Sequence, residues 1–185
     1  FSHLVLVDKN WWIPRATGSR RAPPLWLPVH AEITPFPAIL EYTPYRTRAF
    51  TRAREEPMHH YFAGHGYAAL RVDLRGSGDS DGLLLDEYTQ QEHDDCLEVI
   101  RWIAQQPWCS GVVGMMGKSW GGFNSLQVAA RRPPELKAII TVCSPDDRYS
   151  DDMHYMGGCL LNENLTWGSV LMSYNAYPPD PGLVG

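Results

Sequence analysis

The sequence predicts an α/β protein built on a doubly wound, mostly parallel sheet with helices on both faces. Short apolar runs, such as residues 67–73 and 136–142, have the length and composition of strands. Segments with helical spacing separate several of these runs, as at residues 87–106. Because parallel strands are joined by crossovers that usually contain a helix, this alternation is typical of a doubly wound sheet.

The composition is that of a chain that forms a hydrophobic core. Of its 185 residues, 44% are hydrophobic and 20% are charged, which suits one sizeable domain. The net charge of -5 argues against binding to a nucleic-acid backbone, or to a membrane surface through basic residues. No apolar run approaches the ~18 residues that a membrane-spanning helix needs. We therefore expect neither a nucleic-acid partner nor a membrane partner.

The first half of the chain contains four strand-like segments and one short helix. The strands are expected at residues 4–7, 25–27, 38–42 and 67–73, and the helix at residues 57–63. The segment Arg20–Pro24 (RRAPP) cannot form an inner strand, because its two prolines lack the N–H groups that a neighbouring strand would bind. The last of the four strands ends in the turn-rich segment Arg75–Gly82.

The second half continues the alternation and then departs from it. A helix is expected at residues 87–106, where Pro107 would end it, followed by a strand at 112–116, a helix at 123–132 and a strand at 136–142. From about residue 146 the pattern changes. Residues 153–174 are apolar and partly helical, and the proline-rich residues 177–182 indicate a bend or a linker.

The cysteines and histidines do not form a metal-binding or disulfide pattern. The four cysteines lie in apolar neighbourhoods without CxxC spacing, so we expect buried free thiols in a reducing, cytoplasmic compartment. Those cysteines are Cys96, Cys109, Cys143 and Cys159. The histidine groups at residues 59–65 and 93–95 lack a second pair of ligands, and we expect them on solvated helix faces. Neither a metal nor an organic cofactor is expected.

The strongest functional signal is Gly117–Gly121 (GKSWG), which matches the G-x-S-x-G pattern of a nucleophile elbow. A serine on a sharp strand-to-helix turn needs small residues two positions to either side, because strand and helix cross closely there. The context fits, since an apolar strand ends at Met116 and a helix begins near Phe123. We therefore predict that Ser119 is a nucleophile. A glycine-rich packing turn is the alternative.

Two glycine-rich segments also raise the question of phosphate binding. In Gly76–Gly82 (GSGDSDG), Asp81 stands where a dinucleotide-binding loop needs glycine, and the aspartates would repel a pyrophosphate. A structural loop is therefore favoured. Gly117–Ser119 carries the end of a Walker motif, but Val112 stands where that motif needs its first glycine.

A second set of polar residues follows the strand at 136–142. Aspartates 146, 147, 151 and 152 lie where catalytic groups of α/β sheets gather, but they fit the start of a helix equally well. His154 is the only histidine after Ser119, so it satisfies the chain order Ser, acid, His. It lies in the changed, partly helical segment and is a weak candidate for a catalytic base.

Three motifs together resemble a known family. Leu40–Arg46 (LEYTPYR), Val72–Ser80 (VDLRGSGDS) and Gly117–Gly122 (GKSWGG) occur in this order. Over nearly its whole length the chain resembles the N-terminal part of the CocE/NonD hydrolases, the X-Pro dipeptidyl-peptidase-like serine hydrolases. The resemblance implies that residues 1–145 are the N-terminal part of an α/β-hydrolase catalytic domain and that residues 146–185 begin a helical cap.

The same resemblance implies a hydrolase that cleaves esters or amides of small molecules or short peptides through an acyl-enzyme. Ser119 matches the family's nucleophile, and Trp120 matches the residue whose backbone N–H lies in the oxyanion hole. Tyr45 matches the tyrosine whose hydroxyl is the second donor, although it could also be an ordinary surface tyrosine. The family's acid and histidine come after the cap, so we expect both beyond residue 185 and the 185-residue chain to be inactive. The alternative is a non-catalytic binding module of the same fold.

Overall fold

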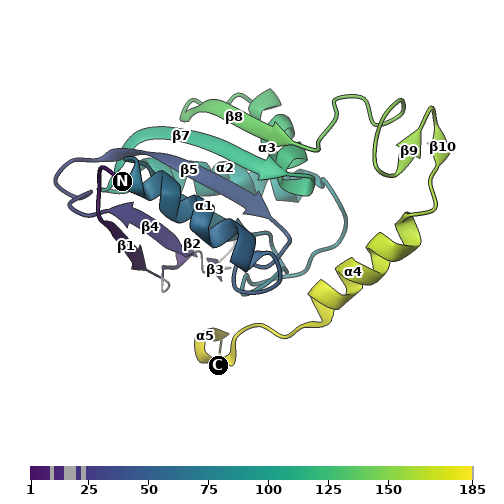
Figure 1. Ribbon diagram of the computed structural model, residues 1–185, viewed down its shortest axis with the longest axis horizontal. Coiled ribbons are helices and arrows are strands. Elements are labelled where there is room, and N and C mark those ends of the chain that lie inside the picture. The colour runs from purple at the N-terminus through teal and green to yellow at the C-terminus, as the bar shows by residue number, and fades with distance from the viewer. Residues whose placement is uncertain (9–10, 15–19, 22–23, 185) are drawn as a thin grey trace.

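The computed structural model describes residues 1–8, 11–14, 20–21 and 24–184. It confirms an α/β fold built on a six-stranded sheet with the strand order β1-β4-β6-β5-β7-β8 (Figure 1). Its strands are β1 (Val5–Asp8), β4 (Leu25–Pro28), β5 (Phe36–Thr43), β6 (Ala68–Asp73), β7 (Cys109–Lys118) and β8 (Leu136–Val142). Strands β6, β5, β7 and β8 are parallel, whereas β1 and β4 are antiparallel to their neighbours.

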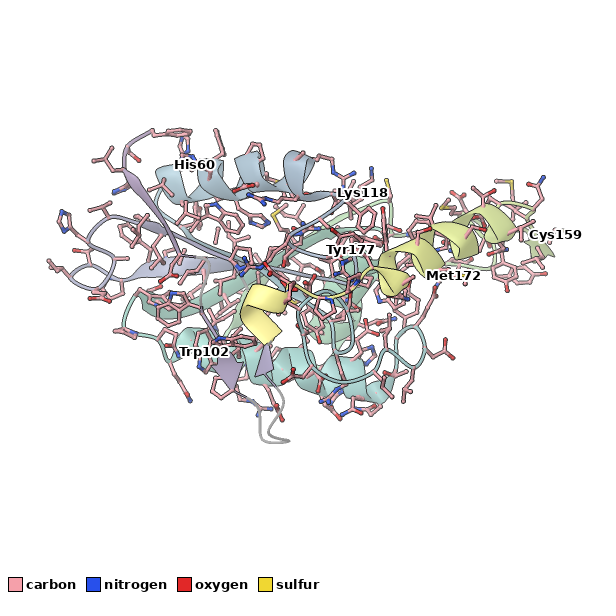
Figure 2. The ribbon with its side chains drawn as sticks, turned by 90° about the horizontal axis from the view of Figure 1, so that it is seen from below. His60, Trp102, Lys118, Cys159, Met172 and Tyr177 are labelled. Carbon is pink, nitrogen blue, oxygen red and sulfur yellow. The ribbon has the colours of Figure 1, made fainter. Side chains whose placement is uncertain are left out.

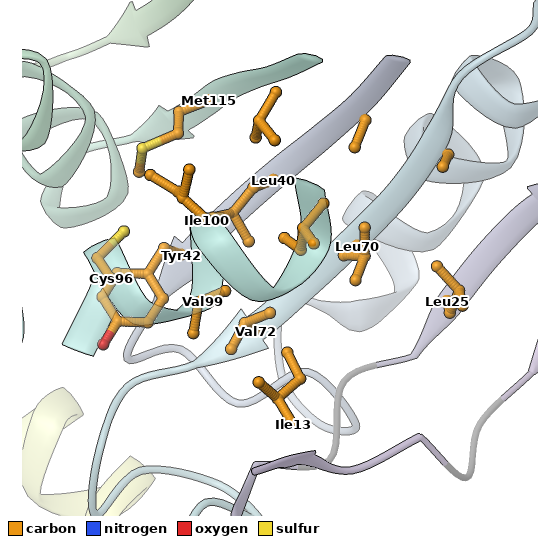
Figure 3. Packing of buried hydrophobic residues seen from close by; sticks show 14 of the residues in the cluster. Ile13, Leu25, Leu40, Tyr42, Leu70, Val72, Cys96, Val99, Ile100 and Met115 are labelled. Carbon is orange, nitrogen blue, oxygen red and sulfur yellow. The ribbon is translucent and has the colours of Figure 1, made fainter. Parts of the chain in front are cut away.

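Helices cover both faces of the sheet. Helix α1 (Arg52–Gly64) lies on one face, and α2 (Gln90–Ala104) and α3 (Trp120–Ala130) lie on the other (Figure 1). The main core lies between α2 and the central strands, where Leu40, Leu70 and Ile100 are fully buried (Figure 3). Because β5 lies between β6 and β7, the loops that follow these three strands meet at one edge of the sheet.

The helices differ from the expected ranges in one informative place. The helix predicted at residues 57–63 begins earlier, at Arg52, and contains Pro57. A proline removes only one N–H from a helix, and the sheet-facing side chains of Glu55 and His59 are buried in α1. Because these side chains are buried against the sheet, the helix begins five residues before Pro57, which the sequence suggests as its first residue.

Beyond β8 the chain leaves the sheet. A short hairpin forms from β9 (Tyr155–Met156) and β10 (Cys159–Leu160), and α4 (Asn164–Ala176) and α5 (Pro181–Val184) follow. The bend expected at residues 177–182 therefore ends in a short helix.

A separate two-stranded pair, β2 (Ile13–Pro14) with β3 (Arg20–Arg21), precedes β4, and residues 22–23 of the RRAPP segment lie outside the described residues. Across the described ranges, no helix is long and apolar enough to span a membrane.

Two expectations about cysteine and histidine need correction. Cys96 and Cys109 are buried as expected, but Cys143 and Cys159 are exposed, because they follow β8 and lie on the β9–β10 hairpin. His59 is fully buried and not on a solvated face. Its Nε2 lies 2.9 Å from a carboxylate oxygen of Glu41, and its ring stacks on Trp26, with 4.9 Å between ring centroids. Glu41 on β5 thus provides a buried partner for His59, which the sequence alone predicts to be exposed to solvent.

Candidate active site

Ser119 lies in a strained turn between β7 and α3. Its backbone has φ 55° and ψ −120°, a left-handed conformation that is costly for a residue other than glycine. Hydrogen bonds hold the turn from both sides. The Ser119 N–H donates to the carbonyl of Val142 (2.8 Å), and its carbonyl accepts from the backbone N–H of Gly122 (2.9 Å) and the hydroxyl of Ser144 (2.9 Å). The turn is the sharp elbow that the sequence predicts, although α3 begins at once, at Trp120.

The small residues around Ser119 are required by close packing. A Cβ at Gly117 would overlap the backbone of Gly121, and a Cβ at Gly122 would overlap the Ser144 side chain. A Cβ at Gly121 would lie 3.4 Å from the Tyr42 carbonyl oxygen, which is a close but ordinary contact. Strand β7 and helix α3 therefore cross at backbone contact distance, which explains the G-x-S-x-G spacing in physical terms.

The Tyr45 hydroxyl lies beside the elbow. It accepts a hydrogen bond from the backbone N–H of Trp120 (3.2 Å), and it also hydrogen-bonds the Ser119 side chain. Tyr45 is buried, and this burial raises the pKa of its phenol, although the hydrogen bonds to Ser119 and Trp120 act in the opposite direction. The hydroxyl therefore stays protonated at neutral pH and is able to donate. The structure thus brings Ser119, Tyr45 and the Trp120 amide together.

A buried carboxylate fixes the other end of Trp120. The indole Nε1–H donates to Oε1 of Glu92 (2.7 Å), whose Oε2 accepts from the backbone N–H of Tyr88 (2.9 Å). Burial raises the pKa of Glu92 against these hydrogen bonds. Sequence reasoning missed Glu92. The capping pair at the start of α2, in which Thr89 caps the Glu92 N–H, indicates where Glu92 lies on the helix but not that it binds Trp120.

The loop that carries Tyr45 is held from the loop after β6. The hydroxyl of Ser77 donates to the carbonyl of Pro44 (2.6 Å), and Asp73 accepts from the backbone N–H of Thr47 (2.8 Å). Both Ser77 and Asp73 are buried. Their positions fall in the second motif noted in the sequence, Val72–Ser80, although no role for them could be read from it. The GSGDSDG segment is thus a structural loop, as expected.

Helix α4 passes over the Tyr45 loop. The rings of Trp167 and Tyr174 approach the Tyr45 ring edge-on, with centroids 6.0 and 6.3 Å away. The Arg46 guanidinium donates to the backbone carbonyls of Tyr174 (3.0 Å) and Tyr177 (2.6 Å). In Figure 2, α4 reaches away from the body of the molecule towards Cys159, while Tyr177 lies where the chain returns to it. The segment after residue 146 is therefore anchored at its returning end, over Tyr45.

Asp147, Asp152 and His154, which follow β8, pair with nearby residues and not with Ser119. His154 Nδ1 lies 2.7 Å from Glu163, Asp152 pairs with Arg148, and Asp147 accepts from the Ser150 hydroxyl. No histidine among the described residues makes a hydrogen bond to Ser119 in the structure. The weak sequence candidates Asp147, Asp152 and His154 therefore make their hydrogen bonds with residues other than Ser119.

A mostly parallel sheet with a left-handed serine between strand β7 and helix α3 is the arrangement of the α/β-hydrolase fold. The family model described as X-Pro dipeptidyl-peptidase (S15 family) matches residues 18–182. The chain belongs to this family.

Named relatives and a solved structure agree. Cocaine esterase from Rhodococcus sp. is 31% identical over 167 residues, which are 90% of this chain and 28% of that protein. A putative serine esterase from Mycobacterium bovis is 37% identical over 90 residues, which are 49% of this chain and 14% of that protein. A CocE/NonD family hydrolase from Staphylococcus aureus superposes with a TM-score of 0.78 at 22% identity, covering 94% of this chain and 34% of that one. The chain thus spans between 14% and 34% of the length of these relatives.

Proposed function

We propose that this protein is a serine hydrolase that cleaves acyl esters or amides of small molecules or short peptides through an acyl-enzyme on Ser119. The observation that carries the proposal is the convergence of the Tyr45 hydroxyl and the Trp120 N–H beside the Ser119 side chain. Two relatives are named esterases, and the family model is named for a peptidase, which supports hydrolysis of an acyl bond.

In this mechanism the Ser119 oxygen attacks the substrate carbonyl while a histidine takes its proton, and a carboxylate holds that histidine's tautomer. The carbonyl oxygen becomes an oxyanion and accepts hydrogen bonds from Tyr45 and from the Trp120 amide. Return of the proton expels the alcohol or amine and leaves the acyl group on Ser119. Water then attacks the ester with the same base and releases the acid. Among the described residues no histidine hydrogen-bonds Ser119, so we assign neither the histidine nor the carboxylate.

We also propose that residues 1–145 belong to the catalytic domain and residues 146–185 begin a helical cap. Support comes from α4, whose Trp167 and Tyr174 rings lie edge-on against the Tyr45 ring. The four cysteines are free thiols, which fits a reducing, cytoplasmic compartment.

The test replaces Ser119 by alanine in the protein at its full natural length. Turnover of an activated phenyl ester should fall by at least about 10³-fold, because no second hydroxyl takes over the nucleophile's role. The matched control is Ser169→Ala, which removes an exposed hydroxyl on α4 and should leave the rate unchanged.

The 185-residue chain itself should hydrolyse the ester no faster than its own Ser119→Ala variant, since a serine without an adjacent base is a weak nucleophile. Covalent labelling by a fluorophosphonate, followed by mass spectrometry of the Ser119 peptide, gives an independent reading in the full-length protein. Unchanged turnover in Ser119→Ala would refute the assignment. Absence of both turnover and labelling in the parent protein would favour a binding module.

A further inference from the structure

We propose that Asp73 is a positioning residue whose carboxylate fixes the loop carrying Tyr45 and thereby sets where the oxyanion is held. The inference rests on the proposed function, because Tyr45 matters to rate only if it binds an oxyanion. Asp73 acts through Thr47, two residues beyond the tyrosine.

The Tyr45 loop needs such an external support. Arg46, the residue after Tyr45, has φ 65°, and Phe50 has φ 48°. A left-handed backbone is unfavourable for a residue other than glycine, so this loop does not hold its shape by local preference. Hydrogen bonds from neighbouring elements must select this conformation over more extended ones.

Asp73 supplies two of these hydrogen bonds. Its Oδ1 accepts from the Thr47 backbone N–H (2.8 Å) and its Oδ2 from the Thr47 hydroxyl (3.1 Å). The carboxylate is only 4% exposed, so these hydrogen bonds do not compete with bulk water. Gly78 makes room for it: a Cβ there would overlap Oδ2, and its backbone is left-handed, with φ 58°.

Asp73 is itself held on a rigid element. It is the last residue of β6, paired with Thr43 of β5, and its carbonyl accepts from the Ser80 hydroxyl (3.0 Å). On the other side of Tyr45, Ser77 of the same loop binds the Pro44 carbonyl. Tyr45 is therefore clamped between two contacts that both originate at the end of β6.

Removal of the Asp73 carboxylate would leave the buried Thr47 N–H without its acceptor, so the strained turn at Arg46 would relax. The Tyr45 hydroxyl would then move relative to the Trp120 N–H. A misplacement of about 1 Å in a catalytic site can cost 10²-fold in rate. Because Tyr45 stabilises charge that exists only in the transition state, the loss should appear in kcat and leave KM almost unchanged.

A double-mutant cycle on the full-length protein tests this. Tyr45→Phe alone should lower kcat by about 10²–10³-fold, as loss of one oxyanion donor does. Asp73→Ala should lower kcat by about 10–100-fold, and Asp73→Asn, whose Oδ1 still accepts from Thr47, should recover most of that rate. In the Tyr45→Phe background Asp73→Ala should have almost no further effect, because the group it positions is already gone. Additive losses would overturn the proposal.

A second measurement does not depend on turnover. With 3-fluorotyrosine incorporated at Tyr45, the fluorine NMR signal should be a single line in the parent protein and should broaden or split in Asp73→Ala. The matched control is Glu41→Gln, which removes another buried carboxylate from the same face of the sheet, where it binds His59 and Arg71. Its Tyr45 signal should stay a single line. A parent protein without Ser119-dependent turnover would refute the proposed function, whereas an unchanged fluorine signal in Asp73→Ala would refute the role of Asp73.

Discussion

Two buried carboxylates hold the segments that supply the two donors of the proposed oxyanion hole. Glu92 binds the Trp120 indole, and Asp73 binds Thr47 next to the Tyr45 loop. Glu92 also accepts from the Tyr88 N–H, and Asp73 accepts from both the N–H and the hydroxyl of Thr47, so each carboxylate links segments that are distant in sequence. Burial raises the pKa of both groups, because their charged forms lose contact with water in the folded protein. Both carboxylates therefore carry a desolvation cost.

Asp73 should make stability depend on pH in a predictable direction. Burial raises its pKa from 3.8 to about 6, although Arg71 and the two Thr47 hydrogen bonds lower it. Between about pH 4 and pH 6 the folded protein therefore holds a proton that the unfolded chain has already released. The stabilisation from this group is complete below pH 3.8 and is lost as the pH rises through 6.

Urea unfolding of the parent and Asp73→Asn at pH 4 and pH 7 measures this effect. The contributions of the other carboxyl groups to the pH dependence cancel when the two proteins are compared, because both proteins contain those groups. The parent should lose on the order of 3 kcal/mol relative to the variant over this interval. A difference in unfolding free energy that is the same at both pH values would contradict the raised pKa.

At the scale of elements, the close crossing of β7 and α3 determines the backbone conformation of Ser119. Gly117 faces Gly121 with no room for a Cβ, and Ser119 is bound to the end of β8 through the Val142 carbonyl. The strand, the helix and the neighbouring strand together hold a backbone conformation that none would adopt alone. The elbow is therefore a product of packing between elements as much as of its own residues.

Gly117→Ala should separate α3 from β7. The new Cβ would overlap the backbone of Gly121, and relief by movement of the helix should cost about 1–3 kcal/mol or more. Gly114→Ala is the matched control on the same strand, since its Cβ would lie 3.6 Å from the nearest atom, an ordinary contact. Thermal unfolding of both variants checks the prediction. Equal melting temperatures would mean that the crossing is looser than the structure shows.

At the scale of the whole molecule, the sheet has an apolar face and edge at β8. In the part of the chain that the structure describes, β8 pairs with β7 alone. Ile140 is 57% exposed and Val142 47%, and an apolar groove of 280 Å³ lies over β5, β7 and β8 on the face next to α1. Unpaired edges and exposed apolar patches promote association between chains.

The 185-residue chain should therefore form oligomers or aggregates as its concentration rises. Ile140→Lys should shift it towards the monomer, because a charge on this face opposes stacking. Leu165→Lys, at an 82% exposed position on α4, is the matched control and should change the association much less. Light scattering across a concentration series is the measurement, and a monodisperse parent monomer at every concentration would contradict the prediction.

Local patterns were enough to predict much of the fold. The strand at residues 136–142 matches β8 residue for residue, because a run of apolar and β-branched residues bounded by turns admits few other structures. The Ser119 elbow was also predictable, since close crossing of strand and helix demands glycine at fixed spacing. Tyr45 came only from the family resemblance, and the structure places its hydroxyl beside the elbow.

Contacts between distant residues were decided only in the tertiary structure. Sequence placed His59 on a solvated face, but Glu41 and Trp26 bury it. The roles of Asp73 and Glu92 depend on partners 26 and 28 residues away, and the place of α4 over Tyr45 depends on Arg46 binding carbonyls more than a hundred residues further along the chain. Periodicity reports which face of an element is apolar, because that preference belongs to the element itself. A buried polar group is stable only when the tertiary fold brings a hydrogen-bonding partner next to it. The local sequence pattern does not show which distant residue that partner is.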